Sequence, residues 1–398
     1  MLNDGYLDER IAAWDRRRTG WGGPLFHGRR PPGPGDLVLM SNDYLGFGRH
    51  PRVALAQAQA MLEQGSGLLM SGVLVGDADP MRTLEQRLAR FLDAPAVLLC
   101  QSGWAANTGL IQSIARPGSP VYIDAAAHAS MWAGGQAANA RILPFAHNDT
   151  SHLARQLDRH GPGLIAVDTL YSVTGDFCPL AELTELANTS RSELIVDESH
   201  TLGVVGPRGA GLAAALGLSR RVAYRTASLA KAFAGRAGLI ACAPPVAGYV
   251  PFHSPSAVFS STLLPHDIAG LTAVLELIRG GDRRRARLYR IAAELRDGLT
   301  VLGYNITPSE SQIISLRPGT EDRLCRLQSA LDSRGVFGAP FAYPAVALHN
   351  SALRLSVHAD LTCDDVAGIL DACASIRDEV GLATWKSTLR KERVTCRL

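Results

Sequence analysis

Short apolar runs alternate with helical patterns along the first two thirds of the chain. The segments between most of the runs have helical periodicity, as in MRTLEQRLARFL (81–92) and AELTELANTS (181–190), and the runs themselves are AVLLC (96–100), PVYI (120–123), LIAVD (164–168), ELIVD (193–197) and GLIACA (238–243). Near-continuous apolar strands that alternate with helices are typical of βαβ units, whose parallel sheet is covered on both faces. The pattern therefore predicts an α/β fold with a large, mainly parallel sheet.

The two ends of the chain have a different pattern. Residues 1–20 predict a charged amphipathic helix, and the Gly- and Pro-rich segment 20–36 predicts an arm. After Pro265 we expect one long helix over 266–302, shorter strands at QIISL (312–316) and LRLSV (353–357), and a helix over 363–380. The predicted organisation is an N-terminal helix and arm (1–50), a large α/β domain (51–265) and a small C-terminal α+β domain (266–398) with a basic tail.

Composition narrows the class of protein. With 398 residues, 46% of them apolar, and a net charge of +3, the chain can bury a large core. Its seven cysteines form no CxxC pair, which disfavours a zinc site or a disulfide framework and fits a reducing compartment. No apolar signal core opens the chain, and the least polar stretch, 238–252, is too short to cross a bilayer. We expect a soluble cytoplasmic protein without a metal, nucleic-acid or membrane partner.

Candidate chemistry follows the predicted strands, because ligands of open α/β sheets collect beyond the carboxyl ends of the strands. After 96–100 comes QSGW, where a Ser102–Gly103 turn opens a helix and offers backbone N–H groups to a phosphate. The run 193–197 ends on Asp197 and His200 follows it, an acid that can pair with a protonated ring nitrogen and an imidazole that can bond a ring substituent. Each signal alone is weak, since a helix N-cap explains either one.

Lys231 stands in the apolar segment TASLAKAF (226–233). An isolated lysine is usually a surface residue, but these neighbours make that interpretation a poor one here. A lysine desolvated in such a place has a lowered pKa and can attack a carbonyl as an amine. Thr226 and Ser228 precede it and can add hydrogen bonds to a phosphate. An amine for a Schiff base, an acid for a pyridinium nitrogen and a phosphate loop together predict pyridoxal 5′-phosphate (PLP).

The same segments resemble the α-oxoamine synthases, a family of fold-type I PLP-dependent transferases. The resemblance covers most of the chain in the expected order, in SNDYLGFGRHP (41–51), QSGWAAN (101–107), DAAAHAS (124–130), PFAHND (144–149), DTLYSVTGD (168–176), VDESHTLGVVGPRGAGL (196–212), TASLAKAFAGRAG (226–238), FSSTLLP (259–265) and LRLSVHAD (353–360). Within the family, these residues are most similar to the synthases of quorum-sensing α-aminoketone and α-hydroxyketone autoinducers. That implies decarboxylative condensation of a medium-chain acyl-CoA with 2-aminobutyrate or S-adenosylmethionine.

The resemblance also implies a role for each matching residue. Lys231 would hold PLP and move the α-proton, Asp197 would pair with the pyridine nitrogen, His128 would stack on the ring, and His200 would bond its phenolic oxygen. Ser102, Gly103, Trp104 and Ser228 would bind the phosphate, and Ser261 and Thr262 would complete the phosphate site of a partner subunit. Arg354 would bind the amino acid carboxylate, and Asn42 and Ser172 would flank the substrate. Sharing of the phosphate site implies a homodimer.

Two positions depart from the pattern of biotin-pathway and glycine-using members. Leu68 stands where those members usually have arginine, and Met81 stands where they have histidine. Both replacements are apolar, which favours a plain acyl chain over an ω-carboxylated one. Three alternatives remain open: another member of the family such as an 8-amino-7-oxononanoate synthase or a sphingoid-base synthase, an aminotransferase, and a PLP-fold binding protein without turnover.

Overall fold

The computed structural model describes residues 5–20 and 29–388, and these residues pack into two compact units. The larger unit comprises Asn42–Ser172 and Asp176–Arg287, and the smaller comprises the described parts of Met1–Ser41, Val173–Gly175 and Leu288–Leu398. The predicted arm lies partly, and the basic tail mainly, outside the described residues. The predicted domain boundaries at 50 and 265 stay predictions, because compact packing does not test which segment folds by itself.

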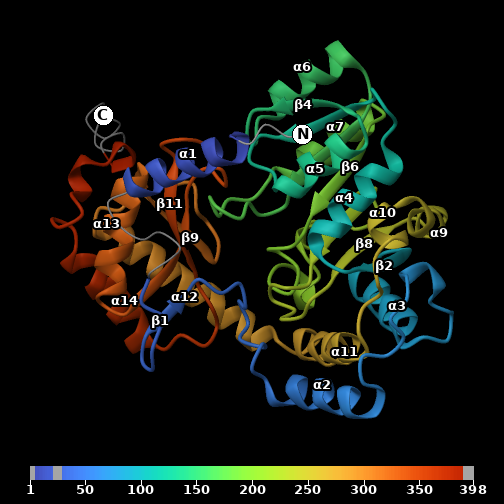
Figure 1. Ribbon diagram of the computed structural model, residues 1–398, viewed down its shortest axis with the longest axis horizontal. Helices are drawn as coiled ribbons and strands as arrows, with labels where there is room; N and C mark the ends of the chain where they lie inside the picture. Colours follow the sequence, from blue (N-terminus) through green and yellow to red (C-terminus); the bar gives the residue numbers. More distant parts are fainter. Residues whose placement is uncertain (1–4, 21–28, 389–398) are drawn as a thin grey trace. The chain divides into compact units, whose positions relative to one another are not determined.

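The larger unit contains a seven-stranded sheet, and its helices precede, separate or follow the strands along the chain (Figure 1). Its strands are β2 (Ala96–Cys100), β3 (Pro120–Asp124), β4 (Arg141–Phe145), β5 (Leu164–Asp168), β6 (Glu193–Asp197), β7 (Tyr224–Ser228) and β8 (Gly238–Cys242). Its helices are α2 (Pro51–Gln64), α3 (Pro80–Leu92), α4 (Gly103–Ile114), α5 (Ala129–Ala137), α6 (Thr150–His160), α7 (Leu180–Thr189), α8 (Leu212–Ala215), α9 (Pro244–His253), α10 (Pro255–Val258), α11 (Pro265–Arg279) and the start of α12 (Asp282–Val301).

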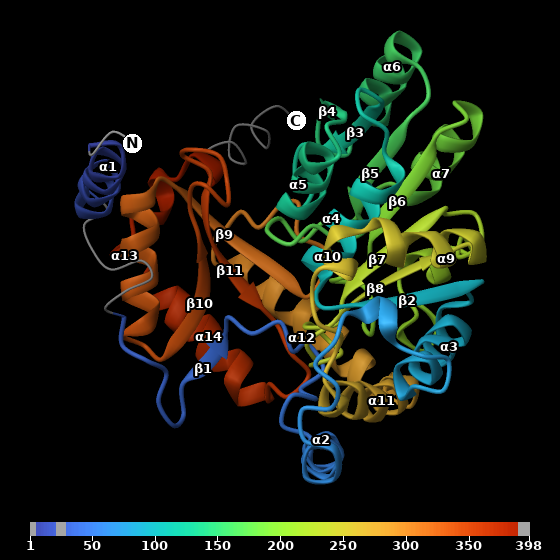
Figure 2. The ribbon, with the colours of Figure 1, turned by 45° about the vertical axis from the view of Figure 1, so that its right-hand side comes forward.

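The strand order of this sheet is β2-β8-β7-β6-β5-β3-β4, which Figure 2 shows from one edge to the other. The pairs from β7 to β4 are parallel, and only β8 runs against its two neighbours β2 and β7. This arrangement confirms the predicted α/β class with a mainly parallel sheet. The register aligns Asp168 with Asp197 and Asp197 with Thr226, so the carboxyl ends of β5, β6 and β7 meet at one edge.

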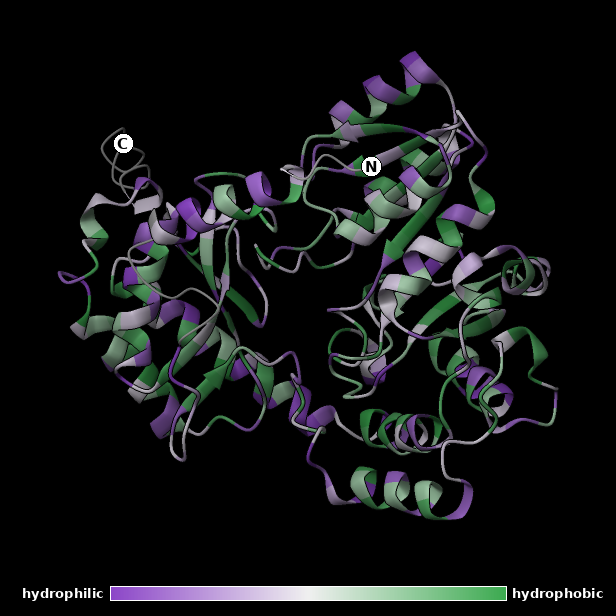
Figure 3. Ribbon diagram, in the orientation of Figure 1, coloured by the Kyte–Doolittle hydropathy of each residue, from purple (hydrophilic) through white to green (hydrophobic). Residues whose placement is uncertain are grey.

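Alternate residues of the central strands build a core on each face of the sheet. On β5, Ile165 and Val167 pack with leucines of α6 and α7, whereas Leu164 and Ala166 pack with residues of α4 and α5. Side chains of successive strand residues point to opposite faces, so a strand buried on both sides reads as a continuous apolar run. Figure 3 shows these strands as mainly hydrophobic, while α6 is hydrophilic over part of its surface.

The smaller unit has a four-stranded sheet of order β1-β10-β11-β9. Its elements are α1 (Tyr6–Gly20), β1 (Leu37–Leu39), the remainder of α12, β9 (Ile313–Gly319), α13 (Glu321–Asp332), β10 (Val336–Phe341), β11 (Ser351–Ser356) and α14 (Cys363–Ser375). The β1–β10 pair is parallel and the other two pairs are antiparallel. This mixed sheet agrees with the α+β pattern expected for the C-terminal region.

One predicted element is wrong. The expected single helix over 266–302 is two helices, α11 and α12, separated at Gly280 and Gly281. Consecutive glycines weaken a helix because their backbones lose the most freedom on ordering. Within the described residues, no helix meets the length and hydropathy needed to span a bilayer, and no group of His, Cys, Asp or Glu is arranged to hold a metal ion.

Candidate active site

A cavity of about 210 Å³ opens at the edge of the sheet where β5, β6 and β7 end. All of its lining residues belong to the larger unit. They are Ser102, Gly103, Trp104, His128, Asp168, Leu170, Asp197, Ser199, His200, Ser228 and Lys231. The structure thus brings together eight of the residues that the sequence proposed, from segments more than a hundred positions apart.

The first turn of α4 forms one wall of this cavity. The Ser102 hydroxyl caps the helix by accepting a hydrogen bond from the backbone N–H of Ala105 at 3.1 Å. A Cβ at Gly103 would stand 2.5 Å from the Cβ of Ser228 and 2.8 Å from its Cα, so only glycine allows this close approach. The open N–H groups and the positive end of a helix favour an anion such as a phosphate at this point.

Asp197 ends β6 with its carboxylate held by two donors. Oδ1 accepts the backbone N–H of Ser199 at 2.8 Å, and Oδ2 accepts the side-chain N–H of Asn107 at 2.7 Å. Asp168 ends the neighbouring strand at the same level. Burial, with the nearby charge of Asp197, raises the pKa of Asp168 well above its usual range. The pair therefore holds one anion, which we assign to Asp197, beside one carboxyl group that favours its neutral form.

His128 caps the N-terminus of α5 beside this pair. Its backbone N–H donates to Oδ1 of Asp168 at 3.2 Å, and its Nδ1 lies 2.7 Å from the Ser130 hydroxyl. Trp104 meets its ring edge-on, with centroids 6.1 Å apart. Desolvation lowers the pKa of His128 against the opposing charge of Asp197, so the imidazole favours its neutral form.

His200 follows Asp197 in a buried turn. Its Nδ1 lies 2.6 Å from the hydroxyl of Tyr44, a fully buried residue of the segment 41–51. A partner on one ring nitrogen fixes the ring's orientation. The role of Tyr44 was not predicted from the sequence, because that contact joins residues 156 positions apart.

Lys231 lies in the turn after β7, half-buried between Leu229, Ala232 and Phe233, which are nearly or fully inaccessible. Its carbonyl oxygen accepts the N–H of Ala234 at 2.8 Å, and Gly235 bonds back to Leu229, so the turn is closed around the lysine. The sequence contains only two other lysines, Lys386 and Lys391, both near the C-terminus. Lys231 is the one lysine that lines this cavity.

The donor set fits PLP. A primary amine, a carboxylate, two imidazoles and a helix N-terminus line one cavity, and each matches a group of that cofactor: the aldehyde, the ring nitrogen, the ring face with its oxygen, and the phosphate. The close approach of Gly103 to Ser228 supports the fit, since a side chain at Gly103 would push apart the two segments that line the phosphate end.

Other predicted residues lie outside the cavity lining. Thr226 is buried and its hydroxyl lies 2.5 Å from the Asn107 carbonyl oxygen. Ser261 is exposed, and its carbonyl oxygen accepts a bond from Gln101, while the Thr262 hydroxyl lies 3.5 Å from the sulfur of Met81. Asn42 and Ser172 sit at the limits of one segment of the larger unit, and Arg354 belongs to β11 of the smaller unit, with its guanidinium over the ring of Phe341.

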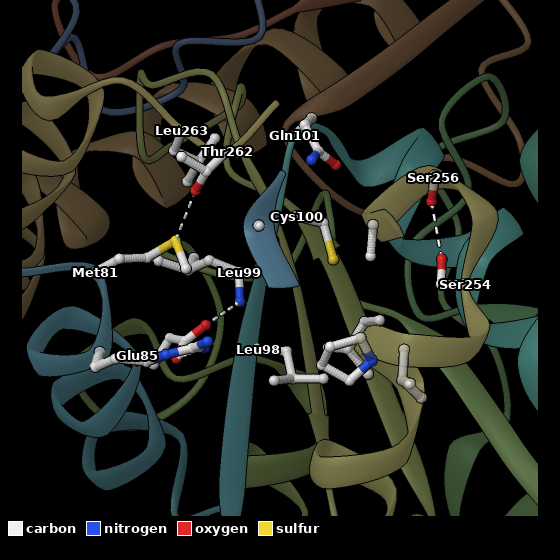
Figure 4. A pocket seen from close by; sticks show the side chains of 16 residues that line it. Met81, Glu85, Leu98, Leu99, Cys100, Gln101, Ser254, Ser256, Thr262 and Leu263 are labelled. Atoms are coloured by element: carbon white, nitrogen blue, oxygen red, sulfur yellow. Dashed lines mark hydrogen bonds and ion pairs between the residues drawn. The ribbon is translucent and has the colours of Figure 1, made fainter. Parts of the chain in front are cut away.

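A second, narrower cavity of about 40 Å³ lies beside Cys100 and Gln101, at the start of the QSGW loop (Figure 4). Met81 points its sulfur toward Thr262, and the Glu85 carboxylate accepts the backbone N–H of Leu99 at 2.8 Å. Burial raises the pKa of Glu85 and raises that of the Cys100 thiol to about 12. Met81 is 4% exposed and Leu68 is 74% exposed, so the two apolar departures lie in different surroundings.

Comparison with known proteins places these features in a family. The model of the aminotransferase class I and II family matches residues 34–372. The CAI-1 autoinducer synthase of Vibrio campbellii is 43% identical over 88% of both chains, and the 8-amino-7-oxononanoate synthase of Trichlorobacter lovleyi is 32% identical over 87% of this chain and 90% of its own.

Solved structures agree with this placement. A structure of SPT with PLP is 26% identical, covers 95% of this chain and 98% of its own, and has a TM-score of 0.85. The serine palmitoyltransferase of Sphingomonas wittichii, at 24% identity and a TM-score of 0.86 over 96% and 99% of the two chains, shows the same fold. The chain belongs to the aminotransferase class I and II family, and its predicted membership of the α-oxoamine synthases is confirmed.

Proposed function

We propose that the chain condenses a medium-chain acyl-CoA with a small amino acid, 2-aminobutyrate or S-adenosylmethionine, to give an α-aminoketone precursor of a quorum-sensing autoinducer. The observation that carries the proposal is the 43% identity to an autoinducer synthase over 88% of both chains. Family membership already confirms the coarser predictions of a PLP-dependent, acyltransferase-type enzyme. The substrates are the part that remains to be tested.

In the overall reaction, the amino acid's α-carbon bonds to the acyl carbon, the thioester C–S bond breaks to release CoA, and the carboxyl group leaves as CO₂. PLP, when bound, supplies an electron sink for the negative charge that develops at the α-carbon. Lys231 would hold the cofactor in the resting enzyme, and its amine would remove and return the α-proton. Asp197 keeps a proton on the pyridine nitrogen, which maximises that sink.

The remaining side chains position the reactants. The first turn of α4 would hold the phosphate, His128 would lie against the ring, and His200, oriented by Tyr44, would bond the ring oxygen. Arg354 binds the amino acid carboxylate, a planar group that the guanidinium matches with two parallel hydrogen bonds. Ser261 and Thr262, absent from this chain's own cavity, complete the phosphate site of a second copy in a homodimer.

The residues around Met81 bear on which acyl chain the enzyme accepts. Met81 takes the place of a histidine found in biotin-pathway relatives and lies in a cavity with mainly apolar walls. Arg82 also lines this cavity, but its guanidinium is paired with Glu85 at 2.9 Å, so a carboxylate here would have to displace that partner, which favours a plain alkyl chain over a pimeloyl chain. An apolar Met81 therefore favours the proposed function over its runner-up, an 8-amino-7-oxononanoate synthase.

The test is a matrix of acyl-CoA and amino acid substrates, followed by free CoA release and by mass spectrometry of the organic extract. We expect octanoyl- to dodecanoyl-CoA with 2-aminobutyrate or S-adenosylmethionine to give a long-chain aminoketone. Turnover with a pimeloyl thioester and alanine would instead identify the runner-up. Amination of keto acids without any release of CoA would identify an aminotransferase and refute the condensation.

A further inference from the structure

Asn107 joins the two sides of the cofactor cavity without lining it. It lies on α4, one turn beyond the phosphate loop, and is 1% exposed. Its amide nitrogen lies 2.7 Å from Oδ2 of Asp197 and 2.9 Å from the Ser130 hydroxyl, and its carbonyl oxygen lies 2.5 Å from the Thr226 hydroxyl. One side chain therefore contacts residues of β6, β7 and α5.

The direction of these hydrogen bonds follows from the chemistry of the partners. An ionised carboxylate only accepts, so the NH₂ group of Asn107 faces Asp197 and its oxygen faces Thr226. The second N–H then donates to the Ser130 oxygen. The reversed amide would place two acceptors against each other inside the core, at the cost of a buried and unpaired carboxylate oxygen.

Ser130 connects these hydrogen bonds to His128. Its oxygen accepts from Asn107, and its own hydrogen is then available to donate to Nδ1 of His128, 2.7 Å away. The backbone N–H of Ser130 also donates to Nδ1, at 3.3 Å, in the N-cap of α5. A nitrogen that accepts from two donors carries no hydrogen, so the imidazole hydrogen resides on Nε2.

We propose that Asn107 is a positioning residue that fixes the Asp197 carboxylate and, through Ser130, holds His128 as the neutral form with its hydrogen on Nε2. Asp197 then keeps its negative charge directed at the cavity with no imidazolium to compete for it. Nε2–H becomes the only hydrogen that the His128 ring offers to a bound group. The catalytic meaning of this arrangement rests on the proposed function, but the hydrogen-bond order itself does not.

The experiment records two-bond ¹H–¹⁵N spectra of the histidine-labelled enzyme, without and with PLP, and assigns the His128 signals from a His128→Gln variant. Two variants divide the network. Ser130→Ala removes the hydroxyl donor to His128 and leaves the bond from Asn107 to Asp197. Asn107→Asp places a second carboxylate against Asp197, and Asn188→Asp on the exposed surface of α7 is the matched control.

We expect the wild type to carry the His128 hydrogen on Nε2 with or without PLP. In Ser130→Ala, His128 should shift toward the Nδ1–H or doubly protonated form, while the dissociation constant for PLP, from fluorescence titration, changes less than about threefold. In Asn107→Asp, affinity for PLP should fall at least about tenfold, and Asn188→Asp should match the wild type.

A hydrogen on Nδ1 of His128 in the wild type, or an unchanged tautomer in Ser130→Ala, would overturn the relay. Wild-type affinity for PLP in Asn107→Asp would overturn the role toward Asp197. If Asn107→Asp does not fold, as judged by circular dichroism, Asn107→Ala replaces it and the same loss of affinity is required. The spectra without PLP are independent of substrate turnover, so they distinguish failure of this inference from failure of the proposed function.

Discussion

His147 lies between two carboxylates on the side of the sheet covered by α6 and α7. Its Nδ1 is 2.9 Å from Oδ1 of Asp124, and its Nε2 is 2.9 Å from Oδ2 of Asp176. Its ring meets the ring of Tyr171 edge-on, with the centroids 4.3 Å apart. Burial opposes the charged imidazolium, but the hydrogen bonds to the two carboxylates outweigh it and raise the pKa of His147 to about 9. We therefore expect His147 to be charged at neutral pH and to stabilise the fold.

The magnitude follows from linkage. With a pKa of about 9 in the folded protein and about 6.5 in the unfolded chain, the proton adds about 3 kcal/mol to the free energy of unfolding at pH 6. Because the folded-state pKa is the higher one, this contribution is fully present below about pH 6.5. It is lost as the pH rises through about 9, and at pH 10 it is close to zero.

The assay compares urea unfolding of the PLP-loaded wild type and His147→Gln at pH 6 and pH 10. We expect the free-energy difference between the two proteins to shrink by about 3 kcal/mol between these pH values. His349→Asn is the control, since His349 is exposed with a φ of 63° that asparagine tolerates, and its free energy of unfolding should stay close to that of the wild type. A His147→Gln difference that is equal at both pH values, or larger at pH 10, would refute the reasoning.

Three further predictions concern the cavity and its support. Gly103→Ala should lower PLP affinity at least about tenfold and destabilise the fold by about 1–3 kcal/mol, because its Cβ would stand 2.5 Å from that of Ser228. Gly248→Ala is the control, since Gly248 has open space around it, and it should change neither the PLP titration nor the thermal unfolding. Asp168→Asn should change PLP affinity less than about threefold, because burial and the nearby Asp197 raise the pKa of Asp168 and favour its neutral form, while Asp197→Asn should weaken it at least about tenfold. Equal losses would contradict the assignment of the anion. Glu198→Gln should cost about 3–5 kcal/mol in urea unfolding, because it leaves the buried guanidinium of Arg225 without its carboxylate partner at 3.2 Å; a loss below 1 kcal/mol would count against that pair.

The strands predicted from the sequence are those that form continuous apolar runs, because they are buried on both faces of the sheet. The five apolar runs became β2, β3, β5, β6 and β8. Two strands were missed for identifiable reasons. The strand β4 contains Pro144, which an edge position tolerates. The strand β7 carries Arg225 and Thr226, polar residues that are buried only because Glu198 and Asn107 bond to them.

Site residues whose own side chain suggests a reaction were predicted from the sequence. Residues that act only by holding another side chain in place were missed. Lys231, Asp197 and His200 follow strands, and the structure places all three in one cavity. Asp168 has the same signal, an acid at the end of an apolar run, and the register beside Asp197 is what reveals it. Asn107 and Tyr44 lie in two of the matching segments, but their roles were not predicted, because these roles arise only when distant segments meet.

The most direct test of the account is the position of PLP on the chain. We would reduce the loaded enzyme with borohydride, digest it and map the pyridoxyl group by mass spectrometry. Lys386 and Lys391 are internal controls, since these and Lys231 are the only lysines in the sequence. The account predicts one pyridoxyl group on the peptide that contains Lys231 and none after Lys231→Ala. A modified Lys386 or Lys391, or an unmodified Lys231 in active enzyme, would contradict the proposed site.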